Sequence, residues 1–387
     1  MDRVKVVHVV TRLDLGGAQQ NTLYTWSHLD PARYEAVLIC GPGGLLDADA
    51  AAAAEAPGGP TLRFLDSLVR ELDPARDLLA LLELVNFFMR EKPAVVHTHS
   101  SKAGILGRLA AAIAGVPAIV HTYHGFGFHD YQGPLTKGFY AALERFCCRL
   151  TRAIVFVSKA NEEYARRHGL GAPGRYHLIR SGVRLGDLPA KVADRGRRRA
   201  ELGFGMHKPL VVSVGNLKPQ KNPADFIALA QRVCAELPDT EFLFIGDGPL
   251  RQRLEFQIVA GGLSNRVRLA GWRRDAAELL ALADVFVLTS LWEGLPRALV
   301  EALKSGLPAV CYATDGVTDL LEDGKNGFVV APRDVTALSE RVLTLLRDPK
   351  RREAMARAAS QSVGPEFDID HMVRAQENLY AALLSHE

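Results

Sequence analysis

Residues 284–312, DVFVLTSLWEGLPRALVEALKSGLPAVCY, contain a complete unit of strand, helix and strand. An apolar run at 284–290 is followed by a turn, by a helical segment and by a second apolar run at 308–312. Pro296 suits the first turn of a helix, and Gly306 suits the position just after one. Strands that alternate with helices in this way are typical of parallel sheets. The stretch therefore predicts an α/β protein.

The same alternation extends over the whole chain. Nearly continuous apolar runs, rather than strict alternation of apolar and polar residues, indicate strands that helices cover on both faces. Two doubly wound parallel sheets are implied. The predicted strands are 4–10, 34–40, 94–100, 118–124 and 153–158 in the first half, and 209–215, 241–246, 267–271, 284–290, 308–312 and 327–332 in the second.

The length of 387 residues favours two domains, because single cores seldom grow beyond about 250–300 residues. The segment 182–207 is polar and basic and contains no predicted strand, so we place the boundary there. We predict one domain at 1–185, a second at 186–365, and a terminal segment at 366–387 in which 367–384 has helical periodicity. The low-complexity segment 47–60 is expected to be a surface loop or a frayed helix.

Composition and charge exclude several classes of protein. Hydrophobic residues at 48% and charged residues at 24% are typical of a folded globular protein, and a net charge of +3 argues against a surface that coats nucleic acid. The five cysteines are odd in number and form no CxxC pair, so we expect reduced thiols. The apolar start is too short for a signal peptide, and the stretch 109–128 is interrupted by Gly115 and Pro117. We therefore expect a cytoplasmic protein whose membrane contact, if any, is peripheral.

Two glutamates in the opening stretch are candidate ligand contacts. Glu293 lies in the turn after the strand, and Glu301 lies on the helix, about 7.5 Å of axial rise beyond Pro296. Such a pair can bind two separated groups that bear hydroxyls, while the start of the helix offers N–H groups to a phosphate. The alternative is a pair of solvated surface acids.

Glycine turns follow other predicted strands. Gly16 and Gly17 after the first strand let the backbone approach a phosphate, although a tight turn without a ligand is an equal alternative. The turn 215–223, GNLKPQKNP, carries Lys218 and Lys221, whose alternative is a solvated loop. Neither GGAQQN at 16–21 nor GDGPLR at 246–251 has the G-x-G-x-x-G spacing, so an NAD enzyme is disfavoured.

Four histidines and two pairs of aspartates are candidate metal ligands. No cysteine or acid completes a ligand set around the strand-end histidines, so we expect core or hydrogen-bonded imidazoles. The two D-x-D patterns do not follow strands in the way a metal-binding pair requires. We therefore predict no metal. The residues concerned are His97, His99, His121 and His124, and the pairs Asp47 with Asp49 and Asp368 with Asp370.

Two further segments carry positive charge. Lys102 lies at a strand end before a helix, where it either binds an acceptor phosphate or is solvated. The helix predicted at 136–152 combines aromatic and aliphatic residues with Lys137, Arg145, Arg149 and Arg152. An amphipathic helix that packs on the core is favoured there over one that docks on a membrane.

The segment 290–312 resembles family 4 of the retaining glycosyltransferases. The mark of that family is two glutamates with seven residues between them, which Glu293 and Glu301 match. The resemblance extends through the whole chain and implies the GT-B fold. In that fold two Rossmann-like domains face each other, the first for the acceptor and the second for the nucleotide-sugar donor, and a terminal helix crosses back to the first domain.

The resemblance also implies roles for residues of the second domain. Glu293 would contact the donor sugar and Glu301 the ribose hydroxyls, with the amides of Gly294 and Leu295 near the sugar or the diphosphate. Lys221 matches a lysine that binds the diphosphate. The arginine that accompanies this lysine in the family is replaced by Asn216, so the pair of cations is incomplete unless Lys218 substitutes.

The remaining implied contacts are glycines and one histidine. The turn of Gly16 and Gly17 would face the donor phosphates, and the turn at Gly246 would shape the nucleotide pocket near the base. His124 matches a histidine that lies against the donor sugar. Lys102 stays the candidate for the acceptor.

The implied reaction is transfer of a hexose or N-acetylhexosamine, with retention, from a nucleotide diphosphate sugar to a sugar acceptor. UDP is the expected nucleotide and GDP the second choice. The segments 98–108, 121–129 and 215–223 are similar to members that build capsular, exopolysaccharide or O-antigen units on lipid-linked acceptors. No cofactor is expected, because Lys221 and helix dipoles would neutralise the leaving diphosphate.

Three alternatives share this architecture. A nucleotide-sugar epimerase would need no acceptor, and a glycan phosphorylase would need a lysine that binds pyridoxal phosphate. A non-catalytic protein that binds sugar nucleotides is supported by Asn216 alone.

Overall fold

The computed structural model describes residues 3–128, 132–189, 192 and 194–385. The chain divides into two compact units: unit 1 comprises Met1–Gly182 and Ile369–Glu387, and unit 2 comprises Val183–Asp368. The domain boundaries predicted from the sequence lie after residues 185 and 365, whereas the two units divide after residues 182 and 368. Residues 190, 191 and 193 of the predicted boundary segment, and 386 and 387 of the predicted terminal segment, lie outside the described residues.

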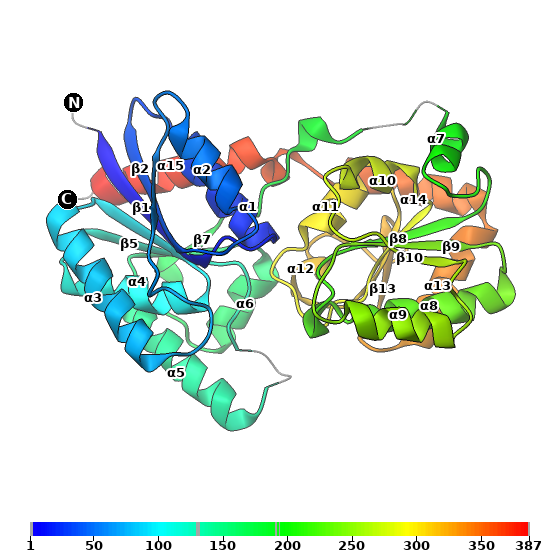
Figure 1. Ribbon diagram of the computed structural model, residues 1–387, viewed down its shortest axis with the longest axis horizontal. Coiled ribbons are helices and arrows are strands. Elements are labelled where there is room, and N and C mark those ends of the chain that lie inside the picture. Colours follow the sequence, from blue (N-terminus) through cyan, green and yellow to red (C-terminus); the bar gives the residue numbers. More distant parts are fainter. Residues whose placement is uncertain (1–2, 129–131, 190–191, 193, 386–387) are drawn as a thin grey trace. The chain divides into compact units, whose positions relative to one another are not determined.

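Unit 1 is built on a seven-stranded sheet in which all neighbouring strands are parallel, in the order β3-β2-β1-β4-β5-β6-β7 (Figure 1). The order reverses between β1 and β4, so the helices that follow these strands leave in opposite directions. The strands are β1 (Val4–Arg12), β2 (Tyr34–Gly41), β3 (Thr61–Phe64), β4 (Val95–His99), β5 (Ala118–Tyr123), β6 (Ala153–Phe156) and β7 (Tyr176–Leu178).

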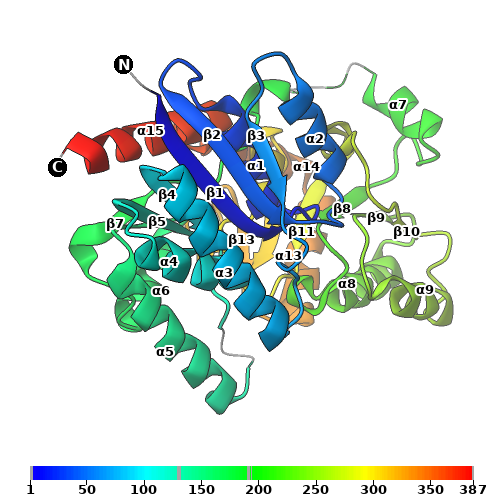
Figure 2. The ribbon, with the colours of Figure 1, turned by 60° about the vertical axis from the view of Figure 1, so that its left-hand side comes forward.

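Helices cover both faces of this sheet. Within β1, Val7 and Val9 pack toward the side of α3 and α4, whereas Val6 and Val10 pack with Trp26 of α1. Figure 2 shows α3, α4 and α5 side by side in one layer. The helices are α1 (Gly17–His28), α2 (Asp47–Glu55), α3 (Pro74–Glu91), α4 (Ser101–Ile113), α5 (Pro134–Leu150), α6 (Lys159–Arg167) and α15 (Ile369–Ser385), with the 3-10 turn η1 (Pro173–Arg175).

The terminal helix α15 returns to unit 1, as the sequence predicted. Its buried Met372 and Tyr380 join the core that contains Val6 and Trp26. Polar contacts add to this packing, since the Tyr34 hydroxyl donates to the carbonyl of Glu377 at 3.1 Å.

Unit 2 has a six-stranded parallel sheet in the order β10-β9-β8-β11-β12-β13. Here the order reverses between β8 and β11. The strands are β8 (Leu210–Val214), β9 (Glu241–Ile245), β10 (Val267–Leu269), β11 (Val285–Leu288), β12 (Ala309–Tyr312) and β13 (Gly327–Val330).

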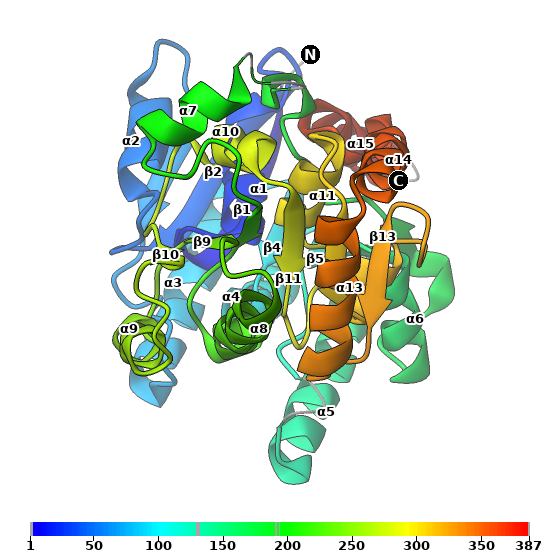
Figure 3. The same cartoon turned by 90° about the vertical axis from the view of Figure 1, so that its right-hand side faces the viewer.

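Two helical layers also enclose the sheet of unit 2. One contains α8, α9 and α13, whose Phe226, Leu254 and Leu338 share a core with the strands. The other contains α7, α10, α11 and α14, and Figure 3 shows α8 and α11 on opposite sides of β11. The helices are α7 (Arg195–Glu201), α8 (Pro223–Glu236), α9 (Arg251–Ala260), α10 (Ala276–Leu282), α11 (Arg297–Lys304), α12 (Asp315–Thr318), α13 (Val335–Arg347) and α14 (Pro349–Gln361), with the 3-10 turns η2 (Leu185–Asp187), η3 (Pro219–Lys221) and η4 (Pro365–Phe367).

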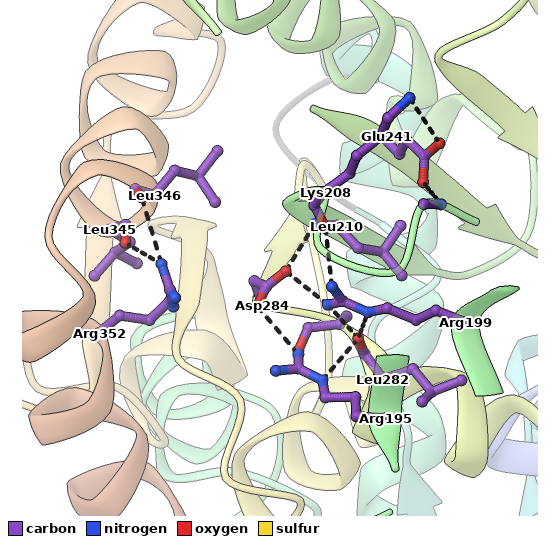
Figure 4. Close-up of polar contacts among 12 residues, drawn as sticks. Arg195, Arg199, Lys208, Leu210, Glu241, Leu282, Asp284, Leu345, Leu346 and Arg352 are labelled. Atoms are coloured by element: carbon purple, nitrogen blue, oxygen red, sulfur yellow. Dashed lines mark hydrogen bonds and ion pairs between the residues drawn. The ribbon is translucent and has the colours of Figure 1, made fainter. Parts of the chain in front are cut away.

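Arginines attach α7 to the start of the central strands (Figure 4). The buried carboxylate of Asp284, which precedes β11, accepts bonds from Arg199 at 2.7 Å, Arg195 at 3.2 Å and the backbone N–H of Leu210 at 2.8 Å. A buried carboxylate needs such partners. The basic character of the predicted boundary segment is therefore explained in part by this contact with the sheet.

The structure adds elements that the apolar patterns did not indicate. The edge strands β3 and β7 were missed. Of the two alternatives for the segment 47–60, the helical one is found as α2. All five cysteines are free, and four of them are buried. No helix within the described ranges is both long and apolar enough to span a bilayer.

Candidate active site

The strongest candidate site in unit 2 lies where its strand order reverses. Parallel α/β sheets bind ligands beyond the carboxyl ends of their strands at such a point. The turn after β8 carries Asn216 and Lys221, and the turn after β11 carries Glu293. The fold thus brings together two segments that are far apart in the sequence and that were both singled out there.

Lys221 and Glu293 form an ion pair, in which the ammonium group contacts Oε1 of the carboxylate. The Glu293 side chain is 6% exposed and that of Lys221 is 20% exposed. The pair is therefore largely shielded from water. Removing one partner would leave an uncompensated buried charge.

Hydrogen bonds hold the two turns against each other. The side-chain amide of Gln220 donates to the carbonyl of Trp292 at 2.9 Å, and the N–H of Leu291 donates to the carbonyl of Gln220 at 2.8 Å. The Thr289 hydroxyl donates to the carbonyl of Lys221 at 2.9 Å. These contacts fix the backbone on both sides of the ion pair, so its position is set by the fold.

Glycine permits close backbone contact at the edge of this site. Gly246 follows β9 with a φ of +136°, and a Cβ there would overlap the carbonyl oxygen of Gly215. The turn predicted to shape the nucleotide pocket therefore contacts the turn that carries Asn216 and Lys221. Asn216 is partly exposed, and its carbonyl accepts a bond from the N–H of Lys218 at 2.8 Å.

Glu301 lies on α11, one turn after the helix begins at Arg297, and Pro296 caps that helix. Gly294 and Leu295 are buried in the turn before it. Burial raises the pKa of Glu301, while the nearby Arg297 guanidinium opposes this rise. Burial also lowers the pKa of Arg297.

Arg297 was missed by sequence reasoning. Arg297 and Glu301 are four residues apart, so both side chains lie on one face of the helix. This spacing is the sequence signal that could have identified Arg297 as a neighbour of Glu301. The structure thus adds a partly exposed cation that interacts with Glu301.

In unit 1, the strand order reverses between β1 and β4, and α1 and α4 begin beyond their carboxyl ends. Gly16 caps α1 in an extended conformation with a φ of −165°, and its carbonyl accepts a bond from Gln20 at 3.0 Å. Gly17 is the first residue of the helix. The conformation does not itself require glycine at residue 16, and a Cβ there would meet only the flexible Gln19 side chain.

His124 follows β5 and is hydrogen-bonded to another histidine. Its Nε2 lies 3.2 Å from Nδ1 of His99, whose Nε2 lies 3.1 Å from Nδ1 of His8. His8 is fully buried and was not singled out from the sequence, because its partner is distant in the chain. His97 and His121 instead bond to hydroxyl groups, so the prediction of hydrogen-bonded histidines is confirmed for these residues.

A small cavity adjoins His99 and His124. Its water-accessible volume of about 10 Å³ is close to the minimum for one water molecule. Hydroxyl and amide side chains of α1, β5 and α15 supply most of the polar groups that line it, namely Asn21, Thr22, Thr25, Thr122 and Gln376.

Lys102 is engaged within unit 1. Its ammonium group lies 2.5 Å from the Asp77 carboxylate and also contacts the carbonyl of Glu71. Its side chain is 12% exposed. An acceptor phosphate would have to compete with Asp77 for this cation.

Neither D-x-D pattern belongs to a metal-sized group in the described part of the chain. Asp47 accepts bonds from the N–H groups of Gly43 and Gly44 at 2.7 and 2.9 Å, and Asp370 accepts from the Tyr24 hydroxyl at 2.6 Å. The described residues contain one cluster of possible ligands, formed by His8, His97 and His99.

Comparison with protein families assigns both halves of the chain. Residues 16–182 match the family described as "Glycosyl transferase 4-like domain", and residues 194–362 match "Glycosyl transferases group 1".

Named relatives extend over nearly the whole chain. The Escherichia coli protein named UDP-Gal:alpha-D-GlcNAc-diphosphoundecaprenol alpha-1,3-galactosyltransferase is 31% identical over 98% of this chain and 97% of its own length. The alpha-D-kanosaminyltransferase of Streptomyces kanamyceticus is 31% identical over 72% of this chain and 75% of its own length.

Solved structures share the fold. Sucrose-phosphate synthase from Thermosynechococcus elongatus aligns with a TM-score of 0.85 at 20% identity, covering 100% of both chains. The Anabaena protein HepE, solved in complex with UDP and glucose, aligns with a TM-score of 0.83 at 20% identity, covering 98% of this chain and 100% of its own.

Proposed function

The chain belongs to the group 1 glycosyltransferases of family 4, and we propose that it transfers a hexose or N-acetylhexosamine with retention from a nucleotide diphosphate sugar. Its fold is the one called GT-B. UDP is the proposed nucleotide, with GDP as the second choice. The E. coli relative is named for a UDP-galactose donor, which supports this order.

The observation that carries the proposal is the buried pair of Lys221 and Glu293 at the reversal of strand order in unit 2. A diphosphate bound beside Glu293 alone would be repelled by its carboxylate. Lys221 relieves this repulsion, because its ammonium group can contact the carboxylate and a phosphate oxygen together. We assign the diphosphate to Lys221 and the donor sugar to Glu293.

The other donor contacts follow from their positions on the same elements. Glu301 on α11 would accept bonds from the ribose hydroxyls, and the amides of Gly294 and Leu295 would approach the sugar or the diphosphate at the start of that helix. Gly246 would lie near the base. From unit 1, Gly16 and Gly17 would serve the phosphates, and His124 would contact the donor sugar.

In the proposed reaction, the acceptor hydroxyl attacks the anomeric carbon on the face from which the diphosphate departs. The bond from the anomeric carbon to the phosphate oxygen breaks as the new glycosidic bond forms, and the departing oxygen accepts the hydroxyl proton. Lys221 and the N-terminus of α11 stabilise the developing charge on the diphosphate. We propose that no metal is needed, and the engagement of Asp47 and Asp370 in other hydrogen bonds supports this.

We propose a polyprenyl-diphosphate-linked sugar as the acceptor, in the synthesis of surface polysaccharide. The name of the E. coli relative specifies such an acceptor for that protein. Lys102 remains the candidate contact for an acceptor phosphate, which would replace the Asp77 carboxylate as the partner of its ammonium group.

A test combines purified protein with UDP- and GDP-sugars, with and without N-acetylglucosamine linked to undecaprenyl diphosphate. Nucleotide release that depends on this acceptor, with an α-linked product from an α-linked donor, is the expected result. Isomerised donor without acceptor would indicate an epimerase. Donor binding without turnover for any pair would indicate a non-catalytic binding protein.

The surface of α5 supports contact with the inner face of the plasma membrane. The inner side of the helix buries Ala141, Glu144 and Cys147, whereas Leu135 is 89% exposed and Phe139 is 65% exposed. Arg145 and Arg149 are also exposed on this helix. Exposed apolar residues beside basic ones are the pattern of helices that bind anionic membranes.

Sedimentation with anionic vesicles tests this contact. Arg145→Glu combined with Arg149→Glu should abolish cosedimentation and leave turnover of a soluble acceptor analogue unchanged. Arg253→Glu combined with Lys350→Glu makes the same charge change at exposed positions of unit 2 and should keep vesicle binding. Equal binding by all three proteins would assign α5 to core packing alone.

A further inference from the structure

The residue that follows Lys221 has a backbone conformation that is uncommon outside glycine. Asn222 lies between the 3-10 turn η3 and the helix α8, with a φ of +44° and a ψ of +54°, in the left-handed region. Residues other than glycine seldom adopt this region, although asparagine does so more often than most. The chain therefore has a constrained geometry directly after the lysine that we assign to the diphosphate.

The start of α8 does not itself require this conformation. Both α8 and α14 have proline as their first residue. At the equivalent position before α14, Asp348 has a φ of −117°, and its side chain accepts a bond from the N–H of Arg351, as is usual at the start of a helix. The Asn222 side chain makes no such capping bond to α8, all of whose residues the structure describes. The left-handed conformation therefore belongs to the turn of Lys221 rather than to the helix.

Side chains of α8 and β12 hold Asn222 in place. Its amide donates to Oδ2 of Asp225, in the first turn of α8, at 2.6 Å. The same oxygen accepts a bond from the hydroxyl of Tyr312, at the end of β12, at 2.7 Å. Burial, together with the bond to Asp225, raises the pKa of Tyr312, so its hydroxyl stays protonated and is the donor. A buried strand thus fixes the aspartate, and the aspartate fixes the asparagine.

Lys221 is held from its carbonyl group to its ammonium group. The Thr289 hydroxyl, directly after β11, lies 2.9 Å from the carbonyl oxygen of Lys221 and 3.0 Å from that of Asn222. The aliphatic part of the lysine lies over Gly215, where an added Cβ would be 3.3 Å from its Cδ. The ammonium group contacts Glu293. A change of φ or ψ at Asn222 would move the lysine relative to α8, and these contacts could not all persist.

We propose that Asn222, Asp225 and Tyr312 are positioning residues for Lys221. They fix the turn of the chain at Asn222, and this turn holds the ammonium group beside Glu293. The catalytic part of this inference rests on the proposed function, in which Lys221 binds the diphosphate, whereas the placement of Lys221 is a property of the unliganded protein. A displacement of about 1 Å at a catalytic group can lower a rate about 100-fold, so such a network has a measurable effect.

Stabilisation of α8 alone is the competing explanation for these contacts. In that case, loss of Asp225 or of the Tyr312 hydroxyl would lower the stability of unit 2 and leave Lys221 where it is. In the positioning role, the same changes lower kcat and free the ammonium group of Lys221. The two explanations therefore differ in kinetics and in the reactivity of one lysine.

Steady-state kinetics of conservative variants test the network. Tyr312→Phe removes one hydroxyl, keeps the ring in the core and should lower kcat about threefold. Asp225→Ala removes the acceptor for both bonds and should lower kcat about tenfold, with a smaller change in donor KM. Asp225→Asn keeps an oxygen that can accept both bonds and should recover most of this loss.

Variants of Asn222 test the path by which Asp225 acts. Asn222→Ala disfavours the left-handed conformation and should lower kcat about tenfold, whereas Asn222→Gly permits this conformation and should lose only a few-fold. Asp225→Ala added to Asn222→Gly should be about as active as Asn222→Gly alone, because the amide through which Asp225 acts is already absent. An undiminished loss from Asp225→Ala in that background would overturn the inference.

Asp348→Ala is the matched control for stability, because it removes the side-chain cap of α14 at the same kind of helix start. It should lower the melting temperature and keep kcat within about twofold. If Asp225→Ala lowered kcat no more than Asp348→Ala does, Asp225 would have a helix-stabilising role alone.

Acetylation followed by mass spectrometry measures the placement of Lys221 without turnover. In the unliganded protein, Lys221 should react more slowly than the exposed Lys350, because its ammonium group is largely shielded and paired. Asp225→Ala and Asn222→Ala should each raise the rate at Lys221 about threefold or more and leave the rate at Lys350 unchanged. An unchanged rate at Lys221 in both variants would contradict the positioning role. If no donor is turned over at all, the proposed function fails, while this measurement still decides how Lys221 is held.

Discussion

The two units carry different chemistry at the same topological position. In unit 2, the strand ends at the reversal of order carry an ion pair of lysine and buried glutamate. In unit 1, the corresponding ends carry hydrogen-bonded imidazoles, and every histidine of the chain except His207 belongs to this unit. Two sheets of the same kind therefore support a charged site and a neutral one, because the side chains at the strand ends, not the sheet, determine the chemistry.

The contrast also concerns how each unit responds to protons. Neutral histidines in a core act on stability, since they remain unprotonated only while the fold excludes water. In the proposed function, the ion pair of unit 2 acts on ligand binding instead. Changes of pH and substitutions that act on one unit at a time test whether the two units differ in this way.

The largest expected effect is selective destabilisation of unit 1 in mild acid. Burial lowers the pKa of four histidines below the value of about 6.5 that they have in the unfolded chain. Below pH 6.5 the unfolded state therefore binds more protons, and the free energy of unfolding falls with pH. One pH unit below that value, each histidine costs on the order of 1 kcal/mol, so the four together cost several kcal/mol, which is comparable with the stability of a domain. The residues are His8, His97, His99 and His121.

Hydrogen exchange with mass spectrometry, corrected for intrinsic exchange rates, resolves the two units in this experiment. Peptides of β1, β4 and β5 should lose protection between pH 7.5 and 5.5, and those of β8 and β11 should keep it. If unit 2 lost its protection from hydrogen exchange at a higher pH than unit 1, the proposed difference between the two units would be wrong.

Lys221→Ala should give the next largest effect. The developing charge on the diphosphate loses its cation, so kcat should fall about 10²- to 10³-fold. The double variant Lys221→Ala with Glu293→Gln removes the unpaired buried carboxylate, and it should restore stability without restoring activity. Lys218→Ala on the same turn is the comparison; a larger loss there than at Lys221 would move the diphosphate contact to Lys218.

The two glutamates should differ in kinetics. Ribose hydroxyls change little between ground and transition state, so Glu301→Ala should raise donor KM about tenfold with a smaller effect on kcat. The sugar beside Glu293 becomes cation-like as its bond breaks, so Glu293→Ala should lower kcat itself. Calorimetric binding of free UDP should weaken in the Glu301 variant and persist in the Glu293 variant. The opposite order in both measurements would exchange their roles.

The smallest effect is expected for Asn216→Arg. Asn216 is partly exposed on the turn of Lys221, so a longer cationic side chain has room to extend toward solvent or a ligand. Activity should stay the same or rise a few-fold, as steady-state kinetics would show. Loss of folded protein would mean that the turn is packed more tightly than the structure indicates.

Local patterns predicted the features that depend on neighbouring residues. The alternation of strands and helices, the start of α11 after Pro296 and the turns of Lys221 and Glu293 all follow from short segments. The strands β3 and β7 were missed because they are short edge strands, and β3 is largely exposed, so neither shows a long apolar run.

Contacts between distant residues could not be predicted in the same way. His8 lies in an apolar strand whose sequence gives no sign of a partner 91 residues away. Likewise, nothing near Lys102 indicates that it pairs with Asp77 of α3. The sequence therefore identified candidate residues, while the fold determined which of them are in contact.

The return of α15 to unit 1 has a consequence for synthesis on the ribosome. Residues 183–368 form an insertion within unit 1, so unit 2 has all of its residues before unit 1 does. Until Tyr380 emerges, His97 lacks one of its two hydroxyl partners, and the core around Val6 and Trp26 lacks the residues of α15 that pack on it. The nascent chain therefore passes through a stage in which unit 2 is complete while unit 1 stays partly open until α15 is translated.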